Sequence, residues 1–144
     1  MIPIPGETPG AWFVNTGAED GRVARARAGG YSPAFTVEGY FLHDVPAAVL
    51  AEGGPHGRPE DDVVFGQPFP LDGWPDVATR ILVAADDRFF PADFQRRVAR
   101  TRLGRDVEVI PGGHLVALSR PVELTERLVG LLDSVPRDGG GTAA

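Results

Sequence analysis

The residues best suited to chemistry are two aspartates and a histidine, each placed just after an apolar run in the second half of the chain. Asp86 and Asp87 follow RILVAA directly, and His114 follows DVEVI after a Gly-Gly turn. A carboxylate can accept a hydrogen bond from one ring nitrogen of histidine, which leaves the other nitrogen free as a general base. The pattern therefore predicts an acid–base pair, provided that both runs end at the same edge of one sheet.

Each of these residues, taken alone, has a more ordinary explanation. An aspartate after a strand is most often a turn residue or a helix cap, and a single histidine is most often structural. Catalytic groups of open α/β sheets, however, gather beyond the carboxyl ends of the strands. Because both kinds of residue follow consecutive strand-like runs, their joint placement favours a catalytic role over the separate structural ones.

The elements that must position this pair alternate between strands and helices. Residues 80–85 form a continuous apolar run, which is typical of a parallel strand buried on both faces. Residues 92–104 have the spacing of an amphipathic helix that stops at Gly104, and 106–110 form a second short strand. Ser119 is the expected N-cap of a closing helix. This order predicts two neighbouring parallel strands joined by a right-handed crossover.

The first half of the chain differs from this region in composition and periodicity. Residues 1–75 are rich in glycine and proline with weak periodicity, and we expect a cap-like segment there. Its one expected helix has Asp44 as N-cap, Pro46 in the first turn and an end at Gly53. Residues 76–134 are then the strand–helix–strand–helix unit, and residues 135–144 a disordered tail.

Composition excludes several classes of function. The chain has no cysteine, and all 14 of its basic residues are arginine, so thiol and Schiff-base chemistry are absent. A net charge of −6 argues against nucleic acid, and no apolar run is long enough to span a membrane. We therefore expect a cytoplasmic protein without cofactor.

His43 is expected in the cap, where it could line a pocket, and His56 is expected in solvent. With their neighbouring aspartates, these two histidines fit no metal-ligand spacing.

Two long segments also carry a family resemblance. ILVAADDRFFPADFQRRV and PGGHLVALSRPVELTERL resemble the final third of α/β-hydrolase-fold enzymes, particularly small esterases and hydroxynitrile lyases. The resemblance implies that the acid of a D-x-x-x-P pattern is Asp87, with Pro91, and that the base of a G-x-H loop is His114. It therefore favours Asp87 over Asp86 as the partner of His114. The start, MIPIPGETPGAWF, resembles the stretch that follows the sixth strand of that fold.

The chain departs from this family in lacking a nucleophile motif. The family orders its triad as serine, acid and histidine, with the serine in a G-x-S-x-G elbow between strand and helix. None of the three serines, Ser32, Ser119 and Ser134, lies in such an elbow. The resemblance then implies the C-terminal part of a doubly wound hydrolase sheet, without nucleophile, oxyanion hole or the first six strands.

The expected function follows from that reading. We expect a C-terminal fragment of a serine-type hydrolase of small esters or related acyl compounds, inactive on its own and prone to associate or remain molten. Lyase or dehalogenase chemistry on the same fold stays open. Two further alternatives are a non-catalytic remnant that binds a small molecule or partner, and one half of a split hydrolase that pairs with a separate N-terminal half.

Overall fold

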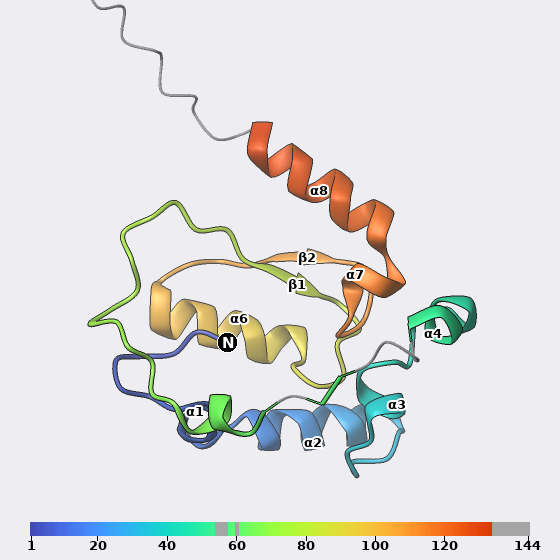
Figure 1. Cartoon of the computed structure of the whole chain (residues 1–144), viewed down its shortest axis with the longest axis horizontal. Coiled ribbons are helices and arrows are strands. Elements are labelled where there is room, and N and C mark those ends of the chain that lie inside the picture. Colours follow the sequence, from blue (N-terminus) through green and yellow to red (C-terminus); the bar gives the residue numbers. More distant parts are fainter. Residues whose placement is uncertain (54–57, 60, 134–144) are drawn as a thin grey trace, which may run out of the picture.

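A small parallel sheet and one helix form the centre of the molecule. The structure, a computed structural model, describes residues 1–53, 58–59 and 61–133. β1 (Leu82–Ala84) and β2 (Glu108–Ile110) pair in parallel, with Val83 opposite Val109. α6 (Ala92–Leu103) connects them and lies along one side of the pair (Figure 1). The predicted strand–helix–strand order is therefore confirmed, although both strands are shorter than their apolar runs.

α6 ends where the sequence predicts. Gly104 adopts a φ of 62° and its N–H bonds to the carbonyls of Ala99 and Arg100. A left-handed residue at this position is favourable for glycine, which has no Cβ to clash. Phe94 and Val98 on α6 are buried, as the helical spacing predicts.

The first half of the chain is largely helical, which differs from the expected irregular cap. α1 (Pro9–Thr16) begins at Thr8, whose side chain accepts a hydrogen bond from the Ala11 N–H. Gly17, with a φ of 66°, ends α1 and begins α2 (Ala18–Gly29). α3 (Val37–Tyr40), α4 (Ala47–Gly53) and α5 (Val63–Gly66) are shorter. Figure 1 shows α1 and α2 on the far side of α6 from the strands.

The hydrophobic core lies between these early helices and α6. Its buried members come from both halves of the sequence: Trp12, Ala18, Phe94 and Val98. The indole of Trp12 meets the rings of Phe90 and Phe94 edge-on at 5.4 and 5.8 Å between centroids. Such edge-to-face pairs add to the stabilisation that comes from burial alone. The first half of the chain is therefore an integral layer of the fold.

A buried ion pair joins the same two halves. The guanidinium of Arg102 binds both carboxylate oxygens of Glu7, with Nη2 2.9 Å from Oε1. It also donates to the carbonyl of Ile2 over 2.7 Å. The hydrogen bond from Arg102 lowers the pKa of Glu7 to about 2, with help from Asn15 and the Ile4 N–H against the opposing effect of burial.

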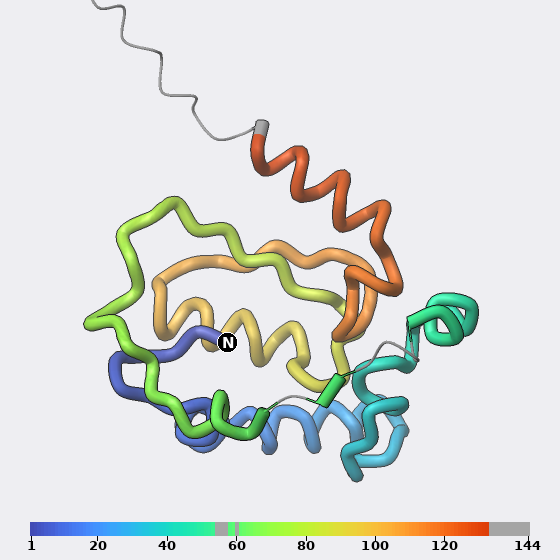
Figure 2. Tube along the Cα trace, viewed as in Figure 1, coloured from blue at the N-terminus to red at the C-terminus, as the bar shows by residue number. Residues whose placement is uncertain are grey.

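The end of the described chain differs from the prediction in detail. α8 (Pro121–Asp133) is preceded by α7 (Val116–Ser119) in a stretch expected to be a loop. Ser119 is the last residue of α7, and its buried hydroxyl has no hydrogen-bond partner, so its expected role as N-cap of the closing helix is wrong. The tube in Figure 2 shows α8 extending away from the rest of the molecule. The expected disordered tail, residues 135–144, lies outside the described residues.

A second predicted cap is also wrong. α4 begins at Ala47 after Pro46, but the carboxylate of Asp44 accepts a hydrogen bond from the N–H of Gly113, 69 residues away. A tertiary contact has thus replaced the local cap that the residue type suggested. Within the described ranges, none of the helices is long and apolar enough to cross a lipid bilayer.

Candidate active site

The structure brings Asp87 and His114 together at the carboxyl end of the two strands. Nδ1 of His114 lies 3.0 Å from Oδ2 and 3.2 Å from Oδ1 of Asp87. Both residues follow parallel neighbouring strands, so their loops open at the same edge of the sheet. A carboxylate can only accept, and Nδ1 must therefore carry the proton of this hydrogen bond. Nε2 is then left with its lone pair.

Asp87 is buried and firmly oriented. It is 5% exposed, and its Oδ1 accepts the backbone N–H groups of Phe89 and Phe90 at 2.8 and 2.9 Å. The side-chain amide of Gln95 donates to Oδ2 over 3.3 Å. These donors fix the plane of the carboxylate toward the imidazole. An aspartate held in this way can orient a histidine.

Asp86 has no part in the pair. Its side chain is exposed, and its backbone N–H donates to the carbonyl of Gly112 over 2.9 Å. That bond continues the link between the two strands into their loops. The geometry thus assigns Asp87, of the two adjacent aspartates, to His114.

Aromatic rings surround the imidazole of His114. Phe41 stacks on it, with centroids 4.4 Å apart and planes inclined by 16°. Phe89 and Phe90 meet it at 5.3 and 5.7 Å. An apolar wall of this kind restricts the rotation of the ring and reduces the access of water to the pair. The Phe41 contact could not be predicted from the sequence, because residues 41 and 114 lie in segments without a shared pattern.

Two glycines shape the loop that carries His114. Gly112 has a φ of 116°, which a residue with a side chain rarely adopts. At Gly113 a Cβ would lie 2.8 Å from Nε2 of His43, so no side chain fits there. The Gly-Gly pair predicted as a sharp turn is therefore required for two different reasons.

The structure describes two of the three serines, Ser32 and Ser119. The hydroxyl of Ser32 accepts a hydrogen bond from the Ala34 N–H, and that of Ser119 is buried beside Gly112. Within the described ranges no hydrogen bond joins either hydroxyl to His114. His56 and Ser134 lie outside the described residues. His43 lies in the segment before α4, with its Nε2 buried against the Gly113 loop.

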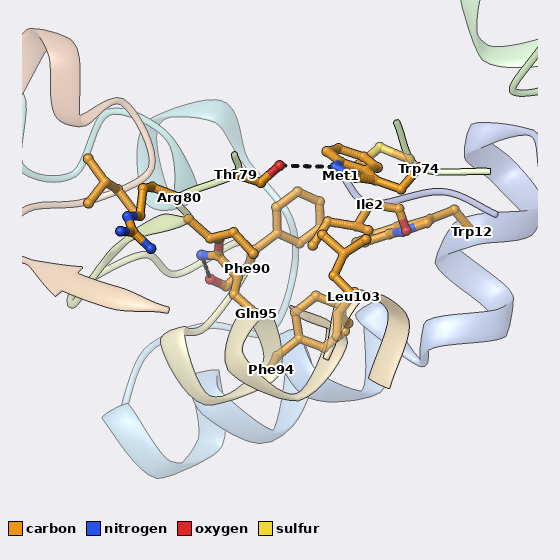
Figure 3. A pocket seen from close by; sticks show the side chains of 13 residues that line it. Met1, Ile2, Trp12, Trp74, Thr79, Arg80, Phe90, Phe94, Gln95 and Leu103 are labelled. Atoms are coloured by element: carbon orange, nitrogen blue, oxygen red, sulfur yellow. Dashed lines mark hydrogen bonds between the residues drawn. The ribbon is translucent and has the colours of Figure 1, made fainter. Parts of the chain in front are cut away.

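A cavity of about 270 Å³ lies beside Phe90 and Gln95, both of which donate a hydrogen bond to Asp87. Figure 3 shows its lining of aromatic and aliphatic side chains from the N-terminal segment, α1, the stretch before β1 and α6. Gln95 belongs to its wall and also donates to Asp87. His114 does not line it, so this cavity is not the space next to the imidazole.

Comparison with known proteins identifies a family for this chain. A family model described as "Alpha/beta hydrolase family" matches residues 1–127. Neither the curated proteins nor the solved structures gave a match to the chain.

Proposed function

The chain belongs to the alpha/beta hydrolase family, and we propose that Asp87 and His114 are the acid and the base of a serine-type hydrolase. The proposed substrates are small esters or related acyl compounds. The observation that carries this proposal is the hydrogen bond of 3.0 Å from Nδ1 of His114 to Oδ2 of Asp87. It lies at the sheet edge where this architecture collects catalytic groups.

The proposed chemistry uses the free nitrogen of the imidazole. Nε2 of His114 removes the proton of a serine hydroxyl while the serine oxygen bonds to the acyl carbon. When the tetrahedral intermediate collapses, the same nitrogen returns the proton to the departing alkoxide. Water then hydrolyses the acyl-enzyme by the same two steps. Asp87 stays ionised throughout, keeps the proton on Nδ1 and stabilises the imidazolium that forms in each step.

We propose that the nucleophile comes from another polypeptide segment and not from the residues of this chain that the structure describes. Ser32 accepts a hydrogen bond within its own loop and Ser119 ends α7, so neither lies on a turn between a strand and a helix. The exposed apolar residues of α8, among them Val129 and Leu132, offer a surface against which such a segment could pack. A split hydrolase, in which a second chain supplies the serine, is the form of the proposal that can be tested directly.

The test combines this chain with a polypeptide that carries the G-x-S-x-G elbow of a family esterase. We expect no saturable hydrolysis of p-nitrophenyl acetate by the 144-residue chain alone, and hydrolysis with an initial burst once the two are co-expressed. His114→Ala should abolish this activity, and Asp87→Asn should lower it about 10⁴-fold, as expected for loss of the correct tautomer. Asp86→Asn is the matched control and should leave the rate unchanged.

Two results would count against the proposal. Saturable hydrolysis by the chain alone, with a fluorophosphonate label on Ser32 or Ser119, would show that the nucleophile lies within it. A stable complex that hydrolyses no ester would favour the alternative of a non-catalytic binding protein, in which the pair has only a structural role.

A further inference from the structure

One short segment contacts both loops of the acid–base pair. This bridging segment, residues 37–45, consists of α3 and the turn that follows it. It is well anchored, because Tyr40 is 1% exposed and its hydroxyl donates to the Ser32 carbonyl over 2.8 Å. Val45 at its other end is also buried. The contacts of the segment are therefore made from a fixed support.

The first set of contacts reaches the loop of the acid. Arg88, the residue after Asp87, donates from Nη1 to the carbonyl of Gly39 over 3.0 Å. The ring of Phe41 meets that of Phe89 edge-on at 4.9 Å between centroids. The two residues that follow Asp87 are thus both in contact with the bridging segment.

The second set reaches the loop of the base. Oδ2 of Asp44 accepts the N–H of Gly113 over 2.6 Å, and Gly113 directly precedes His114. Phe41, three residues earlier, stacks on the imidazole of His114. One contact therefore holds the backbone of the base and the other holds the face of its ring.

Asp44 forms its bond to Gly113 in a place where other buried polar atoms stay without hydrogen-bond partners. Its Oδ1 is buried without a hydrogen-bond partner, and so is Nε2 of His43 beside it. Burying a carboxylate with one oxygen unsatisfied opposes folding, and such a group in a native structure calls for an explanation. Gly113 completes the arrangement, because a Cβ at this residue would lie 2.8 Å from the carboxyl carbon of Asp44.

We propose that Asp44 is a positioning residue for His114, an inference that rests on the proposed function of the Asp87–His114 pair. By accepting the Gly113 N–H, the Asp44 carboxylate holds the loop in the position in which Nδ1 of His114 bonds to Asp87. Without this acceptor the loop would keep the hydrogen bond from the Asp86 N–H to the Gly112 carbonyl and its ring contacts with phenylalanines. Neither holds the backbone of Gly113, and stacking does not specify which ring nitrogen faces Asp87.

The test uses ¹⁵N-labelled full-length chain and the tautomer of the His114 ring as its readout. In the unaltered protein we expect the Nδ1–H form and a Gly113 amide that is protected from hydrogen exchange. In Asp44→Ala the Gly113 amide should exchange at least about tenfold faster, as loss of a charge-assisted hydrogen bond implies, and both tautomers of His114 should be populated. Asp44→Asn keeps an acceptor oxygen and should restore the Nδ1–H form.

The controls separate positioning from stability and from the proposed function itself. Val45→Ala loosens the same segment without removing the acceptor, so it should lower the melting temperature and leave the tautomer unchanged. If Asp87→Asn left the tautomer unchanged, the proposed acid–base pair would fail. If Asp87→Asn altered it and Asp44→Ala did not, only the role of Asp44 would be overturned. If the Asp44→Ala variant does not fold, the unaltered chain still provides a test. A Gly113 amide that exchanges there at the unprotected rate would overturn the proposed role of Asp44.

Discussion

The two longest helices of the second half, α6 and α8, have similar apolar stripes and different surroundings. Val98 on α6 is 4% exposed and packs against Trp12 and Ala18 of the early helices. Val129 on α8 is 52% exposed, and Leu132 is 71% exposed. The periodicity of a helix thus shows which side chains form its apolar face. It does not show whether other residues of this chain pack against that face.

The same contrast exists between two Arg–Glu pairs. Arg102 and Glu7 join α6 to the N-terminal segment, and their side chains are 12% and 2% exposed. Arg127 and Glu108 join α8 to β2, and theirs are 47% and 34% exposed. The packed region and the α8 region should therefore respond to equivalent substitutions in unequal ways.

The largest difference is expected for the two arginines. Arg102→Ala leaves the Glu7 carboxylate buried without its partner, so the free energy of unfolding should fall by about 3–5 kcal/mol. Arg127→Ala removes an exposed pair and should cost about 1 kcal/mol or less. Urea unfolding of both variants, followed by circular dichroism, measures the two values. Equal losses would mean that the two regions are equally well packed.

A smaller difference is expected for the two valines. Val98→Ala removes two buried methyl groups and should lower the free energy of unfolding by about 2 kcal/mol. Val129→Ala should change it by about 0.5 kcal/mol at most, because the side chain is exposed and alanine is the better helix former. The two variants make the same chemical change in two helices. A loss of 2 kcal/mol at Val129 would reveal a partner that covers α8.

The buried pair also predicts a dependence of stability on pH. The pKa of Glu7 falls from its ordinary value of 4.5 to about 2 in the folded chain, chiefly through the hydrogen bond from Arg102. Its contribution is therefore complete above pH 4.5 and is lost as the pH falls toward 2. In that window the slope is about 1.4 kcal/mol per pH unit for one proton. Glu7→Gln should remove this slope, whereas Glu108→Gln should leave it in place.

The smallest effect on stability, and the clearest effect on association, is expected from the surface of α8. The double variant Leu128→Glu, Leu132→Glu should weaken the binding of a hydrophobic dye and lower the sedimentation-average mass, because exposed apolar patches drive association. Its melting temperature should stay close to that of the unaltered chain. If dye binding and mass were unchanged, the exposed stripe would not be the surface through which the chain associates.

The sequence was most informative where a local pattern and a tertiary role coincide. The apolar runs of β1 and β2, the stop at Gly104 and the pairing of Asp87 with His114 were all predictable. Each follows from a rule about strands, caps or sheet edges. The family spacing to Pro91 was enough to choose Asp87 over its neighbour Asp86.

The sequence was least informative where burial uses unusual residues. α2 buries two alanines and Arg22 and has no apolar stripe, so its helical pattern was missed. The guanidinium of Arg22 reaches Glu19 and the carbonyl of Pro33, which satisfies a charge in a buried place. Residue type predicts Asp44 and Ser119 as caps, but Asp44 accepts a hydrogen bond from the distant Gly113 and Ser119 is the last residue of an additional short helix, α7.

The spacing of the site contacts along the chain has a consequence for how the molecule assembles. Asp87 and His114 are 27 residues apart, whereas Asp44 and Gly113 are 69 residues apart. Loop-closure entropy grows with the logarithm of loop length, so the longer contact costs only about 0.8 kcal/mol more to close. Once α6 has brought the two strands together, however, Gly113 is already near the sheet edge. The contact between Asp87 and His114 should therefore form first during refolding. The bridging segment should then bind to the two loops after they have already come together.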